Sequence, residues 1–516
     1  MKTIMLYCKN NLIYTFFSYL LTFFLICSFI FRDNTGFESF VGLLGTLIIS
    51  LVLTPVTTFF IIKLTGISIT CKLNGNPTLN FLYNHTLFYA ISIFIIQLPV
   101  FLAFYPGMVY YDIGVQVDQY DTWDFICNHP LIHTLFTGFF KNLFEHPNTG
   151  YAVTTLIQMG IVCSAMGYTL RYLYHKTGSV ILCTVSILFY GLFPVNSVLT
   201  ISSTKDILFA AFTLIFFIDT LRFLENEITK PFSYARIILN AVLMLHLRNN
   251  AIYAFLPALA IILFIQIKTK KRWKVTLLFL LLTIFLFKGT DKILLTFTQA
   301  TPGSIKEMMS IPAQWQARIY ADTDNEDDKS LIRTYIEEPE KYVYYLSDRI
   351  KQQLPFEVLD SKCKHFLLDS AILFLKYPIT SLDATFYNTQ GFWDPFSCPY
   401  QSDHFFLASR DYRGGAEIDS KLPALMELYV TKFYKTESYQ HNPIADLFCN
   451  IGLYTWIFIL GMFYAMKTKN SPLIFSSLFP FLYLLTLCLG PGAIIRYAFP
   501  YILMAPVIIG KIIYNK

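Results

Sequence analysis

Apolar runs of about twenty residues, separated by short polar breaks, make up most of this chain. Because a helix needs roughly 20 mostly apolar residues to cross about 30 Å of hydrocarbon, each such run predicts a transmembrane helix. Twelve runs are present, at 11–31, 39–62, 86–104, 151–170, 178–195, 206–221, 233–247, 251–267, 275–288, 448–466, 471–489 and 494–511. The pattern therefore predicts an all-α polytopic membrane protein with about twelve transmembrane helices.

Two segments between these runs are too long to be simple connectors. In residues 105–150, the apolar run 129–140 is too short to cross a membrane, which indicates an interfacial or re-entrant helix. Residues 289–447 are polar but contain amphipathic stretches. We therefore divide the chain into an N-terminal transmembrane module, 1–288, a mainly helical loop domain, 289–447, and C-terminal transmembrane helices, 448–516.

The composition agrees with this fold class. Of the 516 residues, 55% are hydrophobic and only 14% are charged, whereas about a quarter of the residues of soluble proteins are charged. The net charge of +6 does not indicate nucleic-acid binding, since the cytoplasmic loops of membrane proteins collect cations. The ten cysteines include no CxxC pair, so they do not indicate a zinc or redox site.

The cations are divided unevenly between the two sets of connecting segments. With the N-terminus in the cytoplasm, the cytoplasmic segments carry 18 Lys and Arg residues, whereas the short loops on the other side carry 5. The positive-inside rule therefore predicts a multi-pass protein of the cell membrane with both termini in the cytoplasm. Residues 105–150 and 289–447 then lie on the extracytoplasmic face.

Polar residues at the start of the first outer loop are candidates for chemistry, since charged groups near lipid are costly. Asp112 follows a Tyr-Pro-Gly turn directly after the third predicted span. Asp112, Gln116 and Gln119 are spaced by four and three residues, which puts them on one face of a short helix. A helix cap or a solvated acid is the simpler interpretation of Asp112. His129 and His133, at i and i+4, are a weak candidate for a metal pair.

Several cations also fall on the predicted outer face. Lys205 and Asp206 head an apolar helix, so that Lys205 and the helix N-terminus together can hold a phosphate; the simpler reading is a cap and a snorkelling lysine. Arg248, Arg318 and Arg496 complete a set large enough to bind a phosphate or diphosphate. Arg248 or Arg496 alone is more simply an anchor at the membrane interface.

The order of these motifs resembles the GT-C superfamily of integral-membrane glycosyltransferases, and within it an uncharacterised Gram-positive bacterial branch. The resemblance covers roughly residues 90–510 and leaves the first two spans unexplained. The residues that carry it are, in order, Tyr105-Pro106-Gly107, Asp112, Gln116, Gln119, His129-Pro130, Lys205-Asp206, Arg248-Asn249-Asn250, Pro312, Gln314, Arg318 and Arg496-Tyr497.

The resemblance implies an inverting transferase that moves a sugar from a polyprenyl phosphate or diphosphate to a cell-envelope acceptor on the extracytoplasmic face. The acceptor would be a glycan, a lipid or a protein, with no nucleic acid involved. Asp112 would be the general base, and the donor phosphate would be held by Lys205, Arg248, Arg318 and Arg496. The residues that would support the site or bind the acceptor are Gln116, Gln119, Asp118, His129, Asp206, Asn249, Gln314 and Trp393.

Two features of the site stay open. Many members of the superfamily have a clear second acid in this loop, whereas here Asp118, Asp121 and Asp124 compete for that position. We assign no metal ligand, although metal-assisted relatives imply that a divalent cation, Mg²⁺ or Mn²⁺, could instead be held by Asp118, His129 and Asp206.

Three other functions fit parts of the pattern. A polymerase or ligase of envelope polysaccharide also has a large outer loop and essential arginines. A transporter or flippase for lipid-linked saccharides would share the outer cations, but it should carry polar residues at the membrane midplane, where the predicted spans have few. A scaffold without enzymatic activity would make the outer-face clustering a coincidence. Trp393 can equally be a sugar-stacking platform or an interface anchor.

Overall fold

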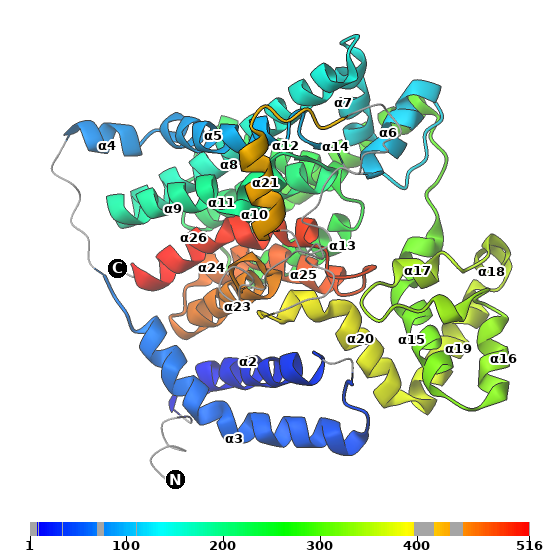
Figure 1. Ribbon diagram of the computed structural model, residues 1–516. Coiled ribbons are helices and arrows are strands. Elements are labelled where there is room, and N and C mark those ends of the chain that lie inside the picture. Colours follow the sequence, from blue (N-terminus) through cyan, green and yellow to red (C-terminus); the bar gives the residue numbers. More distant parts are fainter. Residues whose placement is uncertain are drawn as a thin grey trace.

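The computed structural model describes residues 8, 10–32, 35–69, 77–109, 111–396, 417–433 and 447–514 (Figure 1). In this part of the chain nearly all regular structure is helical, and a single two-stranded sheet pairs β1 (Met108–Val109) with β2 (Ser202–Ser203). Residues 397–416 and 434–446 of the predicted loop domain lie outside the described residues. The all-α fold class is confirmed.

Seven helices in the described ranges are long and apolar enough to cross a membrane. An eighth is added if α9 (Val180–Leu192) and α10 (Pro194–Thr200), which meet at a 58° bend, form one span. The seven are α2 (Leu12–Ile30), α3 (Phe40–Thr65), α5 (Thr86–Ala103), α8 (Pro147–Thr177), α11 (Lys205–Leu224), α13 (Ala251–Lys268) and η3 with α26 (Ile495–Ala498 and Phe499–Ile513). Their number and composition are those of a multi-pass membrane protein.

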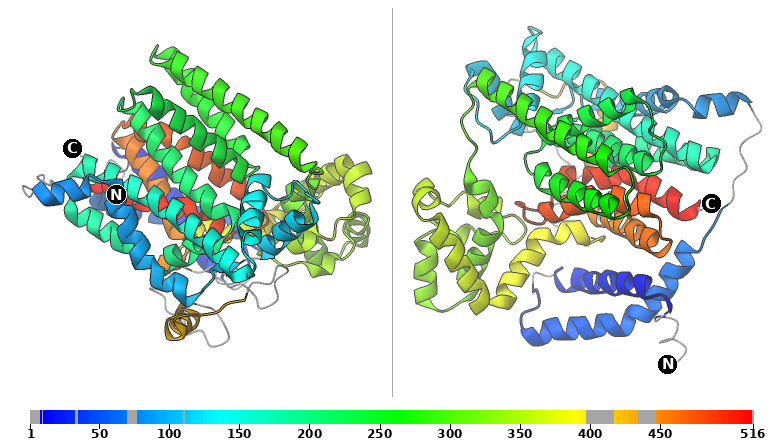
Figure 2. Two further views of the ribbon diagram at one scale, coloured as in Figure 1. Left: turned by 90° about the horizontal axis from the view of Figure 1, so that it is seen from above. Right: turned by 180° about the vertical axis from the view of Figure 1, so that it is seen from behind.

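The other predicted spans are helices that miss this length or composition. Three are shorter: α12 (Pro231–Leu247), α23 (Ile451–Lys467) and the pair α24 and α25 (Ser471–Ser476 and Leu478–Leu487). The fourth, α14 (Trp273–Thr298), runs past the predicted start of the loop domain at residue 289, because apolar residues continue beyond Asp291. α14 lies along one edge of the bundle (Figure 2).

The helix ends follow from local sequence. Ser39 precedes α3 and its hydroxyl accepts a hydrogen bond from the backbone N–H of Gly42, while Ser179 caps α9 in the same way. α8 ends at Gly178, whose φ of 64° suits glycine. The polar breaks between the apolar runs therefore carry the signals that stop one helix and start the next.

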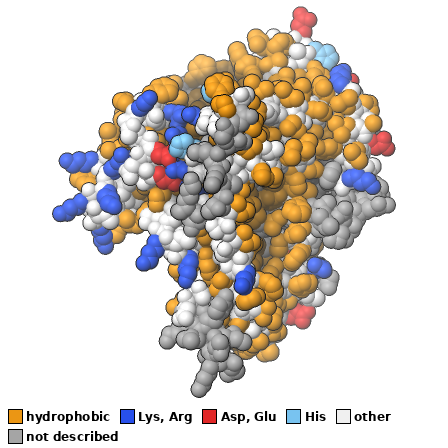
Figure 3. All heavy atoms as spheres, turned by 90° about the vertical axis from the view of Figure 1, so that its left-hand side faces the viewer, with side chains coloured by type: hydrophobic (Ala, Val, Ile, Leu, Met, Phe, Trp, Pro, Cys, Tyr) orange, Lys and Arg blue, Asp and Glu red, His pale blue; other side chains and the backbone are white. Residues whose placement is uncertain are grey.

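The centre of the bundle is formed by α8, α11 and α26, the most buried of the seven long helices. α11 packs against α8, α12 and α26. The α2–α3 pair lies at the edge of the bundle and packs against α23 through α2 (Figure 1). Large hydrophobic side chains on α3, α9, α13 and α14 are exposed, and hydrophobic side chains cover wide areas of the face in Figure 3, as expected for surfaces that meet lipid.

A group of short helices forms a second body beside the bundle, at the right of Figure 1. It has a hydrophobic core of its own, which includes Ala313, Ile332, Ile350 and Phe366. Its elements are η1 (Ile305–Met309), α15 (Ser310–Asp322), α16 (Glu326–Arg333), η2 (Pro339–Lys341), α17 (Asp348–Lys351), α18 (Phe356–Ser361), α19 (Cys363–Lys376) and α20 (Pro378–Trp393). α20 leads back to α23 of the bundle.

A charged network joins the central helices at the end of α11 that lies away from Lys205. Glu225 accepts from Lys176 and from Lys511, each at 2.8 Å. Asp219, which is fully buried, pairs with Arg236. All three cations come from segments that we expect in the cytoplasm, so the structure gathers these segments at one end of the bundle.

Candidate functional site

The short parallel sheet joins the segment before Asp112 to the segment before Lys205. Met108 pairs with Ser202, and the preceding Gly107 has a φ of 115°, which favours glycine. A Cβ on Gly107 would lie 2.4 Å from the side-chain oxygen of Thr155, so the close approach also requires glycine. This pairing sets the start of α6 (Tyr111–Thr122) beside the start of α11.

Asp112 contacts two of the predicted phosphate-binding cations. Its Oδ2 lies 3.1 Å from Nη2 of Arg496 and 3.6 Å from Nζ of Lys205. The side chains of Asp112, Lys205 and Arg496 are 14%, 16% and 4% exposed. Three segments that are distant in sequence thus bring one carboxylate and two cations together in a mostly buried place.

Asp206 connects this group to Arg248. Asp206 is 1% exposed; its Oδ1 accepts from Nη1 of Arg248, and its Oδ2 lies 3.3 Å from Nε of Arg496. The guanidinium of Arg248 also lies over the ring of Tyr497, 4.0 Å from its centroid, and faces Tyr483 at 5.7 Å. We call Asp112, Lys205, Asp206, Arg248 and Arg496 the charge cluster.

The charges of the cluster also shift the pKa values of Asp112 and His129. Burial alone would raise the pKa of Asp112, but Arg496 and Lys205 outweigh it and hold this pKa well below its usual range. His129 accepts a hydrogen bond from Lys205 Nζ through Nδ1 at 3.0 Å. Burial and the neighbouring Lys205 lower the pKa of His129 to about 4, so Asp112 is ionised and His129 is neutral near pH 7.

Gln116 and His129, which we expected to support Asp112, form hydrogen bonds to other residues. Gln116, one turn further along α6, faces α7 (Leu131–Asn142), where its Oε1 lies 3.0 Å from Nδ1 of His133. His129 contacts Lys205 rather than Asp112. His129 precedes α7 while His133 lies within it, so the two histidines do not share a helix face.

Three further predicted residues lie on α6 or contact the first outer loop. Gln119 is buried on α6, and Asp118 is half-buried on the same helix. Asn249 follows Arg248 and donates from Nδ2 to the carbonyl oxygen of Cys127 at 3.2 Å, which ties the α12–α13 connection to the first outer loop. Within the described ranges, no group of three or more His, Cys, Asp or Glu side chains is close enough to hold a metal ion.

Arg318 and Gln314 lie on α15, outside the charge cluster. Arg318 pairs with Asp322 at 2.8 Å, and its guanidinium faces the rings of Tyr342 and Tyr387 at 6.0 and 5.8 Å. Gln314 donates from Nε2 to the carbonyl oxygens of residues 343 and 344. The structure therefore separates Arg318 from the three other predicted phosphate ligands.

Trp393 is part of an aromatic core between α2 and α20. It is 7% exposed and packs against Phe24, Phe31 and Phe386, with centroid separations of 5.3, 6.0 and 5.7 Å. The carbonyl oxygen of Trp393 accepts from Nε1 of Trp456 at 2.8 Å. Because its ring is covered by these side chains, Trp393 offers no open stacking face in this structure.

The sequence is matched over residues 119–516 by the family of unknown function DUF6020. The chain belongs to the DUF6020 family. The DUF6020 match includes Lys205, Asp206, Arg248 and Arg496 of the charge cluster and begins after Asp112. No curated protein and no solved structure matches the chain.

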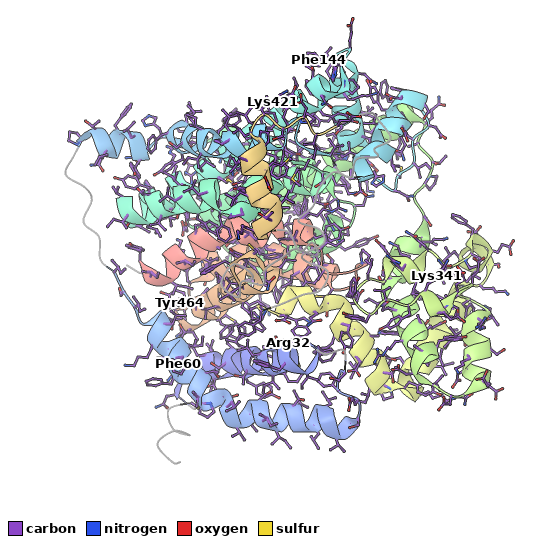
Figure 4. All side chains as sticks on the ribbon, viewed as in Figure 1. Arg32, Phe60, Phe144, Lys341, Lys421 and Tyr464 are labelled. Carbon is purple, nitrogen blue, oxygen red and sulfur yellow. The ribbon has the colours of Figure 1, made fainter. Side chains whose placement is uncertain are left out.

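Within the DUF6020 match, the sequence did not predict how the loop that carries Arg496 is held. Asn388, 1% exposed, donates from Nδ2 to the carbonyl oxygen of Gly490 at 2.9 Å and accepts from the N–H of Ser347 at 3.2 Å. The Ser347 hydroxyl donates to the carbonyl oxygen of Pro491 at 3.0 Å. The segment 341–347, which starts at Lys341 (Figure 4), thus links the loop domain to the turn at residues 490–491 that precedes Arg496. In the sequence, only the Gly-Pro-Gly run at residues 490–492 indicates a turn at this place.

The described end of the long loop returns to the first outer loop as well. The N–H groups of Asp419 and Lys421 (Figure 4) donate to the carbonyl oxygens of Tyr105 and Leu102, each at 2.8 Å. Beyond them, α21 (Pro423–Phe433) packs against α5. Two segments of the DUF6020 match, β2 and residues 419–421, therefore contact the segment that precedes Asp112.

Because His133 is buried, we expect the protein to lose stability in mild acid. Burial, followed by Lys205, lowers the pKa of His133 to about 3, whereas an unfolded chain binds the proton near pH 6.5. Between these values the unfolded state binds more protons, so the free energy of unfolding falls as pH falls from 6.5, by up to about 2 kcal/mol at pH 5. His133→Gln should flatten this dependence in thermal unfolding measured from pH 7.5 to 5.

The matched control is His365→Gln, since His365 is exposed on α19. We expect the control to keep the wild-type pH dependence. If His133→Gln and the wild-type protein lose stability equally between pH 7.5 and 5, His133 is not buried in its neutral form.

Proposed function

We propose that this protein is a membrane glycosyltransferase that uses a polyprenyl-phosphate sugar on the extracytoplasmic face. The observation that carries the proposal is the charge cluster, in which Lys205, Arg248 and Arg496 gather around Asp112 and Asp206. Arginine and lysine side chains that converge in a mostly buried place suit a phosphate group. The GT-C resemblance supplies the type of reaction.

In the proposed reaction, the acceptor hydroxyl oxygen attacks the anomeric carbon of the donor sugar. The bond between that carbon and the phosphate oxygen breaks, and the polyprenyl phosphate leaves with the bonding electrons. Asp112 takes the hydroxyl proton, and Lys205 and Arg496 neutralise the leaving phosphate. Because the arriving phosphate shares these two cations with Asp112, their hold on the carboxylate weakens and its pKa rises, which makes Asp112 a better base.

An apolar groove offers a place for the lipid chain. The groove lies between α9, α23 and α26, and its lining includes Phe189, Tyr454 and Ala505. Arg496 lies in η3, which runs directly into α26, so one continuous segment carries both a residue of the charge cluster and part of the groove lining. Hydrophobic grooves next to a few polar groups are typical ligand sites.

The proposal includes the topology expected from the sequence. About twelve helices cross the membrane, the shorter α12, α23 and α24–α25 among them, and residues 105–150 and 289–447 lie outside. The gathering of Lys176, Arg236 and Lys511 at the opposite end of the bundle supports this orientation.

Cysteine labelling tests this topology. In a cysteine-free background, Ser330→Cys on α16 should react with a membrane-impermeant maleimide in intact cells, since Ser330 is exposed. The control Lys270→Cys, between α13 and α14, should react only after permeabilisation. The reverse pattern would put the charge cluster on the cytoplasmic side and contradict the proposed function.

The reaction itself is tested with purified protein in lipid nanodiscs. A panel of radiolabelled polyprenyl-phosphate hexoses and pentoses is supplied together with cell-envelope acceptors, and free polyprenyl phosphate is measured. We expect release from at least one donor, with the label transferred to the acceptor. Movement of intact donor between leaflets without release would instead identify a flippase.

A further inference from the structure

Five cations lie close together in the sequence where α13 ends and α14 begins. They are Lys268, Lys270, Lys271, Arg272 and Lys274, and we call residues 268–274 the basic turn. The four lysines are exposed, and Arg272 is half-buried. Within the described ranges, no carboxylate forms an ion pair with any of the five cations.

The acidic residues at this end of the bundle are paired with other cations. Glu225 pairs with Lys176 and Lys511. Glu227 pairs with Lys176 and Arg222. The basic turn therefore presents positive charge that these carboxylates do not offset. Lysine and arginine side chains that gather beside the end of a membrane helix attract lipids with negative headgroups.

An apolar cleft lies next to the basic turn, between α11, α12, α13 and α14. Its lining includes Phe223, Leu259 and Phe279. A second apolar cleft, between α11, α13 and the α24–α25 pair, shares the lining residues Thr220, Leu259 and Ile262 with the first. The two clefts therefore adjoin, and together they lead from the basic turn into the bundle.

Arg272 connects the basic turn to the first cleft. Its Nη1 donates to the carbonyl oxygen of Phe223 at 3.4 Å, and its guanidinium carbon lies 5.7 Å from the centroid of the Phe223 ring. Because Phe223 lines the cleft, the guanidinium lies at the end of the cleft that faces the basic turn. A guanidinium has five N–H donors, so Arg272 keeps donors for a phosphate while it contacts Phe223.

The start of α14 matches the order of groups in a phospholipid. Arg272 directly precedes α14, Thr276 follows about one turn later, and Phe279 lies almost one turn further on. Since a helix rises about 1.5 Å per residue, Thr276 lies about 6 Å along the axis from Arg272. The Thr276 hydroxyl is buried in the cleft lining and has no hydrogen-bond partner among the described residues. In a phospholipid the phosphate, the ester carbonyls and the acyl chains follow in this order.

We propose that the basic turn and the adjoining cleft form a binding site for one anionic phospholipid. The lipid phosphate binds Arg272, an ester carbonyl accepts a hydrogen bond from the Thr276 hydroxyl, and one acyl chain enters the cleft. The exposed lysines select a headgroup with a net negative charge. This site is separate from the charge cluster, because Phe223 and Lys205 lie at opposite ends of α11. The inference therefore does not depend on the proposed sugar transfer.

Native mass spectrometry of the full-length protein in detergent measures the binding of single lipids. Dioleoylphosphatidylglycerol is anionic, whereas dioleoylphosphatidylcholine has the same chains and no net charge. We expect the wild-type protein to bind the phosphatidylglycerol about tenfold more tightly, and Arg272→Gln to reduce this preference to about twofold. Thr276→Val keeps the charge and removes the hydroxyl, so it should weaken the binding of phosphatidylglycerol by about threefold.

The matched control is Lys271→Gln, which removes the same charge from the neighbouring, exposed position. We expect this variant to keep most of the wild-type preference. Unfolding midpoints report whether each variant is folded. The site is overturned if the wild-type protein binds the two lipids equally, if Lys271→Gln loses as much preference as Arg272→Gln, or if Thr276→Val binds phosphatidylglycerol as tightly as the wild type. Displacement of the bound lipid by inorganic phosphate alone would also overturn it, because the acyl chain would then contribute nothing.

Discussion

Asp112→Asn is expected to abolish sugar transfer while the lipid phosphate still binds. Asparagine has nearly the same shape, but it cannot take up the proton of the acceptor hydroxyl, and removal of a general base costs about 10²–10⁴-fold in rate. Asp112 also pairs with Arg496 and Lys205, so its loss frees these cations for the phosphate. The measurement compares the release of polyprenyl phosphate from a labelled donor with the binding of undecaprenyl phosphate.

Asp121→Asn provides the control, because it makes the same change on the same helix. Asp121 contacts Lys141 and Asn142, and we expect its variant to keep the wild-type rate. Wild-type turnover by Asp112→Asn would rule out Asp112 as the base. Asp118, half-buried on α6, would then be the next acid to test.

Arg496→Lys should have the second largest effect. The guanidinium of Arg496 reaches Asp112 through Nη2 at 3.1 Å and Asp206 through Nε at 3.3 Å. A lysine ammonium is a point charge and cannot keep both contacts in the geometry of the planar fork. We expect the affinity for undecaprenyl phosphate and the transfer rate to fall by about 10- to 100-fold, as for the loss of a charged hydrogen bond.

The effect of Arg496→Lys has to be separated from a general intolerance of the substitution. Arg333→Lys makes the same change at an exposed pair with Glu340 on the loop domain, and it should leave affinity and rate unchanged. Unfolding midpoints of both variants report whether the fold is intact. A folded Arg496→Lys protein that binds undecaprenyl phosphate as tightly as the wild type would contradict the assignment of Arg496 to the phosphate.

The sequence was informative where the chemistry lies close to an end of a predicted span. Asp112, Lys205, Arg248 and Arg496 all fall at such positions, and the distribution of cations along the chain predicts that they lie on one face of the membrane. The structure brings these four together. The sequence does not predict which cation pairs with which carboxylate. The pairing depends on the β1–β2 sheet and on the hydrogen bond that holds the loop with Gly490.

Residues of the long loop could not be assigned in the same way. Arg318 is positively charged like the other predicted phosphate ligands. However, α15 belongs to a body with its own hydrophobic core, so Arg318 contacts Asp322 and Tyr342 instead. Trp393 looks like an exposed aromatic residue in its local sequence. Its burial depends on Phe24 of α2 and on Phe31 directly after α2, which are distant in sequence, and local patterns do not reveal such partners.

The number of spans shows a similar division between local and long-range information. A helix occupies each of the twelve predicted ranges, since apolar runs and capping residues are local signals. Seven of these helices have the length and composition of a span, or eight with the bent α9–α10 pair. A shorter helix such as α12 could cross a membrane only with the support of neighbouring helices, and a sequence pattern does not describe those neighbours.

The most direct test of the charge cluster as a phosphate site is a structure of the wild-type protein in nanodiscs with undecaprenyl phosphate bound. We expect the phosphorus atom within about 4 Å of Nζ of Lys205 and of the guanidinium of Arg496, with the isoprenoid chain leading toward α26. The contacts of Asp112 with these two cations should lengthen. A phosphate bound elsewhere, with Asp112 still paired to Arg496 and Lys205, would contradict the account.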